Sequence, residues 1–134
     1  MSLDDARIQK FLAGKQTAVL ATVQPDGSPL ATAMWLLPDP AALTMISEAN
    51  TQKVRNLRRD PRVSVVADAT DPIRGVALQG RAEFLPDGAE RRALVERFHA
   101  KYPDLATFWK GRAMPADRVM FRISPAHVRA WGFD

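Results

Sequence analysis

Residues 17–37 read TAVLATVQPDGSPLATAMWLL, and this stretch decides the fold. Its first part, Thr17–Val23, is rich in β-branched residues, which favour strands. Gln24–Gly27 is a strong turn signal, since proline presets one backbone angle and glycine allows a left-handed one. Pro29–Leu37 resumes as a second strand, so the stretch predicts a β-hairpin. Both alternating faces of that strand are largely apolar, which predicts a covered strand near the centre of a sheet.

Four further strands are expected beyond this hairpin. They are Ala42–Ser47, Val63–Ala67, a clear alternation over Val76–Phe84, and Val119–Ile123. A turn at Ser124-Pro125 should then lead into a last extended piece, Val128–Phe133. The chain is therefore mainly β, with six strands.

Helices are expected only at the periphery. A weak capping box at Ser2 and Asp5 begins a helix that ends at Gly14, and Asn50 or Thr51 begins a second one that ends at Arg59. A capping box of Asp87 with Glu90 begins a third, which ends near Tyr102-Pro103, and residues 104–116 are expected to be irregular. Hairpins dominate and no βαβ rhythm is present, which favours a closed or half-closed antiparallel barrel.

Composition sets outer limits on the function. The length of 134 residues suits one domain, and 46% hydrophobic with 25% charged residues is ordinary for a soluble globular protein. The longest nearly apolar run, Leu30–Leu37, is far shorter than a membrane span needs. The N-terminus carries Asp4 and Asp5 and lacks the pattern of a secretory signal, so the expected compartment is the cytoplasm. The absence of cysteine excludes disulfides and thiolate chemistry.

The positive charge is concentrated in one segment. The chain has a net charge of +4, and residues 50–62 hold five cations against one acid, Asp60, so the rest of the chain sums to zero. Such a cluster indicates an anionic partner, although a solvated helix face explains it equally well. Within it, Ser47, Asn50, Thr51 and Lys53 surround a helix N-terminus, where free N–H groups and a lysine favour phosphate. Simple capping beside a solvated lysine is the alternative interpretation.

Other chemistry finds little support. His99 and His127 are the only histidines and sit in no metal-ligand pattern, so no metal is expected and both are interpreted as surface or capping residues. No acid–base pair is visible, and any redox chemistry would therefore depend on a bound cofactor. The three tryptophans, Trp35, Trp109 and Trp131, offer faces for stacking on a planar ring, although core or dimer packing is the favoured interpretation for Trp35.

Three stretches, taken in order and with their spacing, resemble a known family. They are Ala21–Pro29 (ATVQPDGSP), Lys53–Val63 (KVRNLRRDPRV) and Val76–Glu83 (VALQGRAE). The chain resembles the pyridoxamine 5'-phosphate oxidase-like FMN-binding split barrels. The resemblance implies a six-stranded antiparallel Greek-key split β-barrel spanning residues 1–134, and a homodimer with the cofactor at its interface. It also implies an oxidoreductase that transfers hydride between a bound flavin and a small unsaturated substrate.

The resemblance further implies where the cofactor binds. Lys53 and Thr51 would meet its phosphate, the backbone of residues 33–35 and 45–46 would run beside its rings, and Arg74 and Trp109 would approach from the fifth strand or from the other subunit. The full set of expected cofactor-binding residues is Ala33, Met34, Trp35, Met45, Ile46, Ser47, Thr51, Lys53, Arg55, Asn56, Arg58, Arg74 and Trp109. No catalytic side chain is assigned.

Departures from the family pattern narrow the activity. Members that oxidise pyridoxamine phosphate carry arginine at the position of Thr32, Arg-Lys at Gln52-Lys53 and Arg-Gln at Arg74-Gly75, so vitamin B6 oxidation is not expected. The run Lys53–Arg62 is closer to the branch that uses deazaflavin (F-420), whose long polyanionic tail suits its arginines better than the short FMN chain does. Deazaflavin therefore stands slightly ahead of FMN.

Two other classes of function remain open. One is a protein that stores or senses the cofactor without turnover. The other is a nucleic-acid-binding barrel that uses the Lys53–Arg62 patch. Aromatic residues make up only 7% of the chain and none interleaves with that patch, so a stacking platform for bases is missing and nucleic acid is the less favoured partner.

Overall fold

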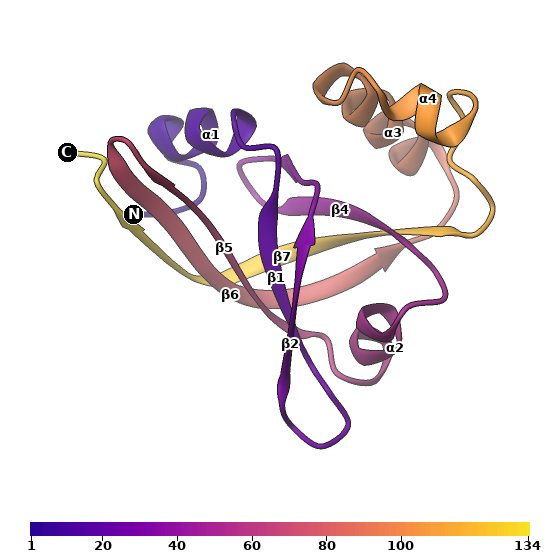
Figure 1. Cartoon of the computed structure of the whole chain (residues 1–134), viewed down its shortest axis with the longest axis horizontal. Coiled ribbons are helices and arrows are strands. Elements are labelled where there is room, and N and C mark those ends of the chain that lie inside the picture. Colours follow the sequence, from indigo (N-terminus) through magenta and orange to yellow (C-terminus); the bar gives the residue numbers. More distant parts are fainter.

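One curled antiparallel sheet dominates the computed structural model, which describes residues 1–134 (Figure 1). Its strands are β1 (Ala18–Val23), β2 (Pro29–Met34), β3 (Leu37–Pro38), β4 (Leu43–Glu48), β5 (Arg62–Thr70), β6 (Ile73–Leu85) and β7 (Arg118–Trp131). The helices are α1 (Ala6–Ala13), α2 (Gln52–Arg59), α3 (Ala89–Lys101) and α4 (Leu105–Trp109). The predicted hairpin is β1–β2, and the mainly β class with peripheral helices is confirmed.

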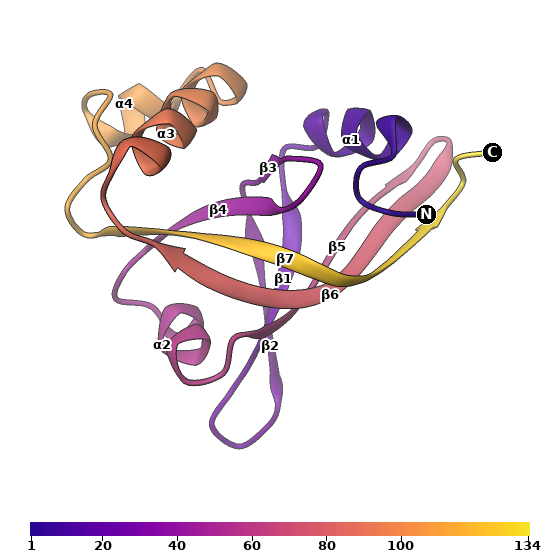
Figure 2. The same cartoon turned by 180° about the vertical axis from the view of Figure 1, so that it is seen from behind.

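The sheet curls until its two edges nearly meet. The strand order is β2-β1-β5-β6-β7-β4-β3, so β2 and β3 are the edges. Only Trp35 and Leu36 separate these two strands in the chain. A stretch from Met34 to Leu37 spans at most about 10 Å, so the edges are forced close together. The result is a half-barrel with a split between β2 and β3, in line with the expected split barrel (Figure 2).

The number and placement of strands differ from the prediction. There are seven strands, because Leu37 and Pro38 leave the predicted second strand and pair with Thr44 and Leu43 of β4 as a separate strand. The prediction that the second strand lies near the centre is wrong. β2 is an edge strand in which only Met34 is buried. Its small apolar residues, Ala31 and Ala33, are exposed rather than covered, which periodicity alone does not reveal.

The predicted turn at Ser124-Pro125 is also wrong. β7 continues through this pair as one strand of 14 residues, and a register shift opposite Gln79 and Gly80 absorbs the proline as a β-bulge. A Cβ on Gly80 would lie 2.1 Å from the carbonyl oxygen of Ser124. The close backbone approach therefore requires glycine, and it lets β6 and β7 run together along their full length.

The helices begin and end close to the predicted positions, but the caps expected from Ser2, from Asp87 and, at α2, from Asn50 or Thr51 are absent. Asp5 caps α1 by accepting from the Arg7 N–H at 2.9 Å, without Ser2. α3 has no side-chain cap; Asp87 pairs with Arg91 and Arg92 instead. The segment expected to be irregular contains the short helix α4. None of the helices is long and apolar enough to span a membrane.

Two hydrophobic clusters hold the molecule together. The larger one fills the barrel, and α1 closes one end of it with Ile8 and Leu12, which are fully buried. The smaller one lies beneath α3 and α4 and includes Phe98, Tyr102 and Leu105. Figures 1 and 2 show α1 and the α3–α4 pair on the same side of the sheet, with α2 on the other. The α3–α4 pair therefore stands over the end of the barrel where β4 and β7 meet.

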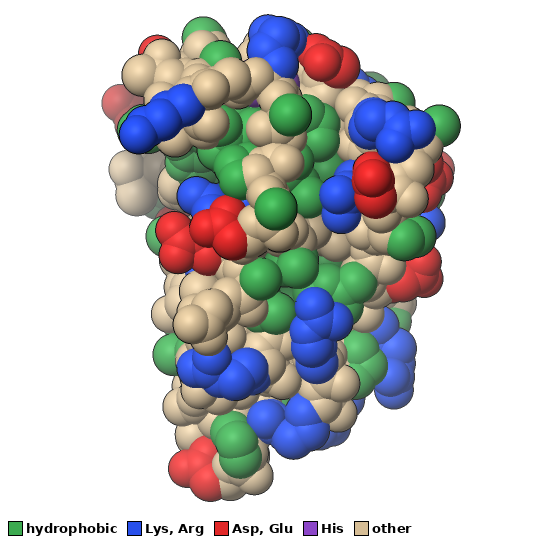
Figure 3. Space-filling model, turned by 90° about the vertical axis from the view of Figure 1, so that its right-hand side faces the viewer, with side chains coloured by type: hydrophobic (Ala, Val, Ile, Leu, Met, Phe, Trp, Pro, Cys, Tyr) green, Lys and Arg blue, Asp and Glu red, His purple; other side chains and the backbone are tan.

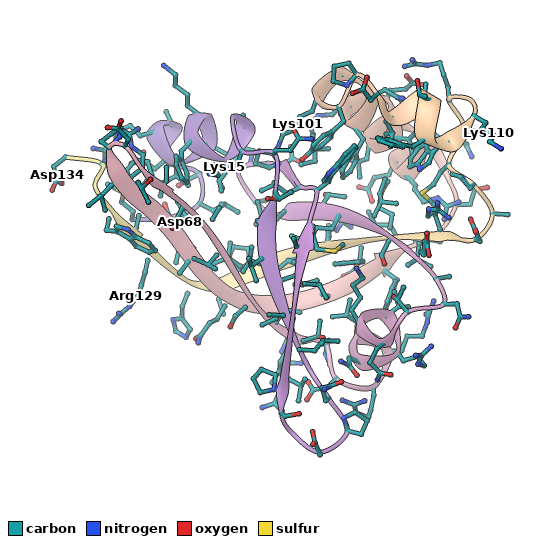
Figure 4. All side chains as sticks on the ribbon, in the orientation of Figure 1. Lys15, Asp68, Lys101, Lys110, Arg129 and Asp134 are labelled. Atoms are coloured by element: carbon teal, nitrogen blue, oxygen red, sulfur yellow. The ribbon has the colours of Figure 1, made fainter.

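Side chains of α3 and of the residue after it supply hydrogen-bond partners for the backbone at the split. Leu36 lies between the two edge strands, yet its N–H donates to the Tyr102 hydroxyl at 2.8 Å. Its carbonyl accepts from the Lys101 ammonium at 2.7 Å, and that ammonium also reaches the Leu12 carbonyl of α1. Figure 4 places Lys101 between α1 and α3. These bonds replace the missing ladder partners and fix the chain at the split.

Candidate functional site

A cavity of about 380 Å³ lies beside the split, between the ends of β2 and β4, the start of α2 and the α3–α4 pair. We call it the split cavity. Eight of the thirteen predicted cofactor-binding residues line it: Ala33, Met34, Trp35, Ile46, Ser47, Thr51, Lys53 and Trp109. The structure thus brings together segment 33–35, at the β2 edge of the sheet, and segment 46–53, which begins in β4 beside the opposite edge strand. The proximity follows from closure of the barrel.

Lys53 marks one end of the split cavity. Its ammonium is half-buried, and its one hydrogen-bond partner is the Met34 sulfur at 3.2 Å. Burial lowers the pKa of Lys53, while the charge of Glu48 partly offsets this effect. A thioether is a weak acceptor, so this ammonium retains most of its capacity to donate. A half-buried ammonium with unused hydrogen-bond donors is suited to bind an anion.

The N-terminus of α2 is open on the same side. Its N-cap residue, Thr51, makes no side-chain capping bond; the hydroxyl donates to the Glu48 carbonyl at 3.2 Å instead. The Ser47 hydroxyl also donates to that carbonyl, at 3.0 Å. The first N–H groups of α2 therefore have no intrahelical or capping partner and carry the positive end of the helix dipole. Together with Lys53 they form a cationic end of the cavity.

Arg118 is a second cation at this end that sequence reasoning missed. It begins β7 and lies opposite Glu48 of β4, with which it forms an ion pair at 3.7 Å. Its guanidinium also pairs with Asp117 at 2.6 Å. The sequence carries no local signal for its position, because only the β4–β7 pairing brings residue 118 beside residues 47–53. Glu48, likewise missed, lies at the same rim.

The opposite end of the split cavity is aromatic. Trp35 stacks on Tyr102 with ring centroids 4.1 Å apart and planes within 9°. Phe98 and Leu105, both buried, and the exposed Phe108 complete the wall, and none of these three was predicted. Trp109 lies edge-on to His99, whose ring is buried and bonds the Arg112 carbonyl at 2.8 Å. The interpretation of His99 as a surface or capping residue is therefore wrong; it anchors the loop after α4.

Five predicted residues lie outside the split cavity: Met45, Arg55, Asn56, Arg58 and Arg74. The strand alternation turns Met45 into the barrel core, while its neighbour Ile46 faces the cavity. Asn56 is fully buried and donates to Thr22 of β1 at 3.0 Å, so it attaches α2 to the barrel. Arg74 lies at the far end of the long hairpin, stacked over Phe133.

Two of these five are arginines on the exposed face of α2. Arg55 bonds the side-chain oxygens of Asn50 and Gln52, and the guanidinium of Arg58 lies 4.3 Å from the centre of the Phe84 ring. Arg59, on the same helix, bonds the Val23 carbonyl. None of the three has a carboxylate partner within ion-pair distance. Figure 3 shows several Lys and Arg side chains gathered on the lower part of one face, whereas basic, acidic and hydrophobic side chains are mixed on its upper part.

Comparison with known proteins identifies the family. The family model for pyridoxamine 5'-phosphate oxidase matches residues 4–132. A conserved hypothetical protein from Mycobacterium tuberculosis is 32% identical with a TM-score of 0.77, over 98% of this chain and 84% of that one. An F420 reductase is 27% identical with a TM-score of 0.70, over 90% and 94% of the two chains. A FAD-binding protein from Mesorhizobium loti is 26% identical with a TM-score of 0.74, over 90% and 87%. The chain described here belongs to the pyridoxamine 5'-phosphate oxidase family.

Proposed function

We propose that this protein is an oxidoreductase that binds a flavin-type cofactor in the split cavity and transfers hydride between it and a small unsaturated organic substrate. The observation that carries the proposal is Lys53, a half-buried ammonium whose one partner is a thioether sulfur, beside the open N-terminus of α2. A phosphate at this point would receive charge-assisted hydrogen bonds from both. The flavin-type relatives support this use of the fold.

The residues of the cavity fit such a cofactor. Lys53, Thr51 and Ser47 would hold the phosphate. Arg118 would interact with the phosphate as well as with Glu48, and so add a second positive charge. The small side chain of Ala33 and the backbone of residues 33–35 would lie along the ring system. When bound, the cofactor supplies a hydride, and solvent supplies the proton that completes a two-electron reduction. The protein contributes binding, orientation and exclusion of water.

The deazaflavin coenzyme is our preferred cofactor over FMN. Its polyanionic tail would extend beyond the phosphate, and α2 presents Arg55, Arg58 and Arg59 without carboxylate partners next to the cationic end of the cavity. An FMN phosphate would end at Lys53 and leave these arginines unused. The relative named as an F420 reductase agrees with this choice.

We further propose that the protein works as a homodimer. The outer face of β1, β5, β6 and β7 carries a groove of about 600 Å³, which we call the sheet-face groove. Val19 and Val66 lie directly opposite each other in it and remain 40% and 37% exposed. Exposed valines on a sheet are suited to burial against a protein partner. Arg74 lies outside the split cavity of its own chain, so it would contact cofactor only from a partner subunit.

A titration of cofactor-stripped protein with FMN and with the deazaflavin coenzyme tests the proposal. Trp35 and Trp109 line the split cavity, whereas Trp131 packs against Gly75 at the far end of the sheet. A Trp131→Phe variant therefore isolates the fluorescence of the cavity tryptophans. We expect quenching with the deazaflavin coenzyme at lower concentration than with FMN. Binding of neither compound by the folded protein would overturn the proposal.

A storage or sensing protein is the second candidate, and one observation favours it. The only carboxylate lining the split cavity is Glu48, whose side chain is 67% exposed, so the cavity offers no buried carboxylic acid to donate a proton. Multiple-turnover assays with reduced cofactor and a panel of enones, quinones and tetrapyrroles separate the two candidates. The nucleic-acid alternative predicts a steep salt dependence of binding to DNA or RNA. Against it, Lys53 points into a cavity and not across an exposed face.

A further inference from the structure

We propose that the aromatic end of the split cavity is a separate subsite for the substrate, which takes a planar conjugated ring, and that Phe108 determines its specificity. The inference rests on the proposed function, since it assigns the cationic end to the cofactor phosphate. It adds the chemical class of the substrate and a residue that recognises it. The relevant side chains are Trp35, Leu105 and Phe108.

The two ends of the cavity differ in chemistry, which is the first step of the argument. Every ionisable group in the lining comes from β4, α2 or the start of β7: Glu48, Lys53 and Arg118. The part contributed by α3 and α4 is aromatic and aliphatic, without an ionisable group: Phe98, Leu105, Phe108 and Trp109. A phosphate belongs at the first end. The second end offers only surface that a neutral, flat molecule would cover.

Trp35 forms a rigid base for this subsite. One face of its ring is covered by Tyr102 at a centroid distance of 4.1 Å, and the next residue, Leu36, is held at both its N–H and its carbonyl. The indole therefore has little freedom to turn. The Phe108 ring stands beside it with centroids 5.9 Å apart and planes inclined at 66°. The two rings form an angled corner in the wall of the cavity.

Phe108 is the exposed part of that corner. Its side chain is 65% exposed, although Leu105 of the same helix is only 5% exposed. Covering an aromatic ring that is exposed to water at the mouth of a cavity is favourable, and a ring–ring contact strengthens binding beyond the effect of the buried area.

The backbone that carries Phe108 is also held in position. The loop after α4 is attached to α3 by the bond from His99 to the Arg112 carbonyl and by the Arg112–Glu96 ion pair. A backbone that is ordered before any ligand arrives lowers the cost of binding.

Equilibrium binding to the cofactor-loaded protein tests the subsite. The probes are menadione, a planar two-ring quinone, and 2-cyclohexen-1-one, which lacks an aromatic ring, each titrated calorimetrically against the oxidised holoprotein. We expect Phe108→Ala to weaken menadione binding about three- to tenfold, as the loss of one aromatic contact predicts. Cyclohexenone affinity should change less than about twofold. Phe108→Tyr keeps the ring and should bind menadione with nearly the wild-type affinity.

A neighbouring variant and a separate titration keep the outcomes distinct. Lys110→Ala changes an exposed residue two positions further on that does not line the cavity, and we expect it to affect neither probe. The affinity of the cofactor is measured for every variant. Failure of the wild-type protein to bind cofactor overturns the proposed function itself. Normal cofactor binding with unchanged menadione affinity in Phe108→Ala overturns the subsite alone. Weaker cofactor binding in Phe108→Ala also overturns it, since Phe108 would then belong to the cofactor.

Discussion

The split cavity and the sheet-face groove are both large, but one exposes unused hydrogen-bonding groups and the other exposes apolar surface. The groove is the larger, about 600 Å³ against about 380 Å³. It leaves apolar area uncovered, chiefly at Val19 and Val66, on the paired strands of the sheet. The split cavity leaves hydrogen-bonding capacity uncovered, at Lys53 and at the first turn of α2.

The difference shows that size alone does not identify a ligand site. Uncovered apolar area on a sheet is satisfied by another flat protein surface, which needs no special chemistry. An uncovered ammonium beside free helix N–H groups is satisfied only by an anion of matching size. This contrast is why we propose the smaller cavity for the cofactor and the larger groove for a second copy of the chain.

The largest expected effect tests the groove. Val66→Asp places a charge in the middle of the proposed interface, and burial of an unpaired carboxylate should weaken the dimer by roughly a hundredfold or more. Sedimentation at a series of concentrations measures the change. Ile73→Asp is the matched control, because Ile73 is 72% exposed but lies outside the groove. Dissociation by the Ile73 variant instead would move the interface to the hairpin tip.

The next largest effect tests the split cavity. Lys53→Ala should weaken cofactor binding by an order of magnitude or more, since a charge-assisted phosphate contact contributes about 1.5–3 kcal/mol. Arg129→Ala removes a cation from the sheet-face groove and should leave the affinity nearly unchanged. Equal losses in both variants, measured by fluorescence titration, would break the distinction between the two cavities.

The pH dependence of binding sharpens the role of Lys53. Burial lowers its pKa below the ordinary 10.5, so the ammonium loses its proton, and with it the phosphate contact, at a lower pH than an exposed lysine would. Cofactor affinity should therefore fall over a pH range that begins below the one in which an exposed lysine, with a pKa of 10.5, loses its proton. Lys53→Arg remains charged throughout this range and should show a flat profile. A flat profile in the wild-type protein would mean that another group holds the phosphate.

The sequence predicts the cationic end of the cavity better than the aromatic end, for a physical reason. Ser47, Thr51 and Lys53 are near neighbours in the chain, and a helix N-terminus is a local feature. Phe98, Phe108 and Arg118 reach the cavity only because α3 packs over the split and β7 pairs with β4. The edge position of β2 was missed in the same way, since a strand with small apolar residues on both faces has the same pattern at an edge as at the centre.

A smaller effect tests how the cavity wall is held at the split. Tyr102→Phe keeps the stacking on Trp35 but removes the hydroxyl that accepts from the Leu36 N–H. Leaving that buried donor without a partner should reduce the free energy of unfolding by about 1–2 kcal/mol. Urea denaturation measures it, and the cofactor titration should show a modest loss as Trp35 loosens. Unchanged stability would mean that water takes the place of the hydroxyl.

The smallest effect separates two half-buried lysines. Lys101, unlike Lys53, is bonded to two backbone carbonyls, at 2.7 and 3.2 Å, and we interpret it as structural. Burial lowers its pKa from 10.5 to about 8, so below pH 8 the folded state bears the cost of a buried charge that the unfolded state avoids. Stability should therefore rise as pH increases from about 8 toward 10.5, and Lys101→Met should not show this rise.

Urea denaturation at about pH 7 and pH 9.5 compares the wild type with Lys101→Met. The upper limit matters, because burial also raises the pKa of Tyr102 from 10.0, and ionisation of that phenol in the unfolded chain would reduce stability above this range. Parallel changes in the two proteins would show that the carbonyl bonds offset burial completely. With cofactor bound, we expect the pH dependence due to Lys53 to change and that due to Lys101 to stay the same. Only Lys53 gains a partner when the cavity is filled.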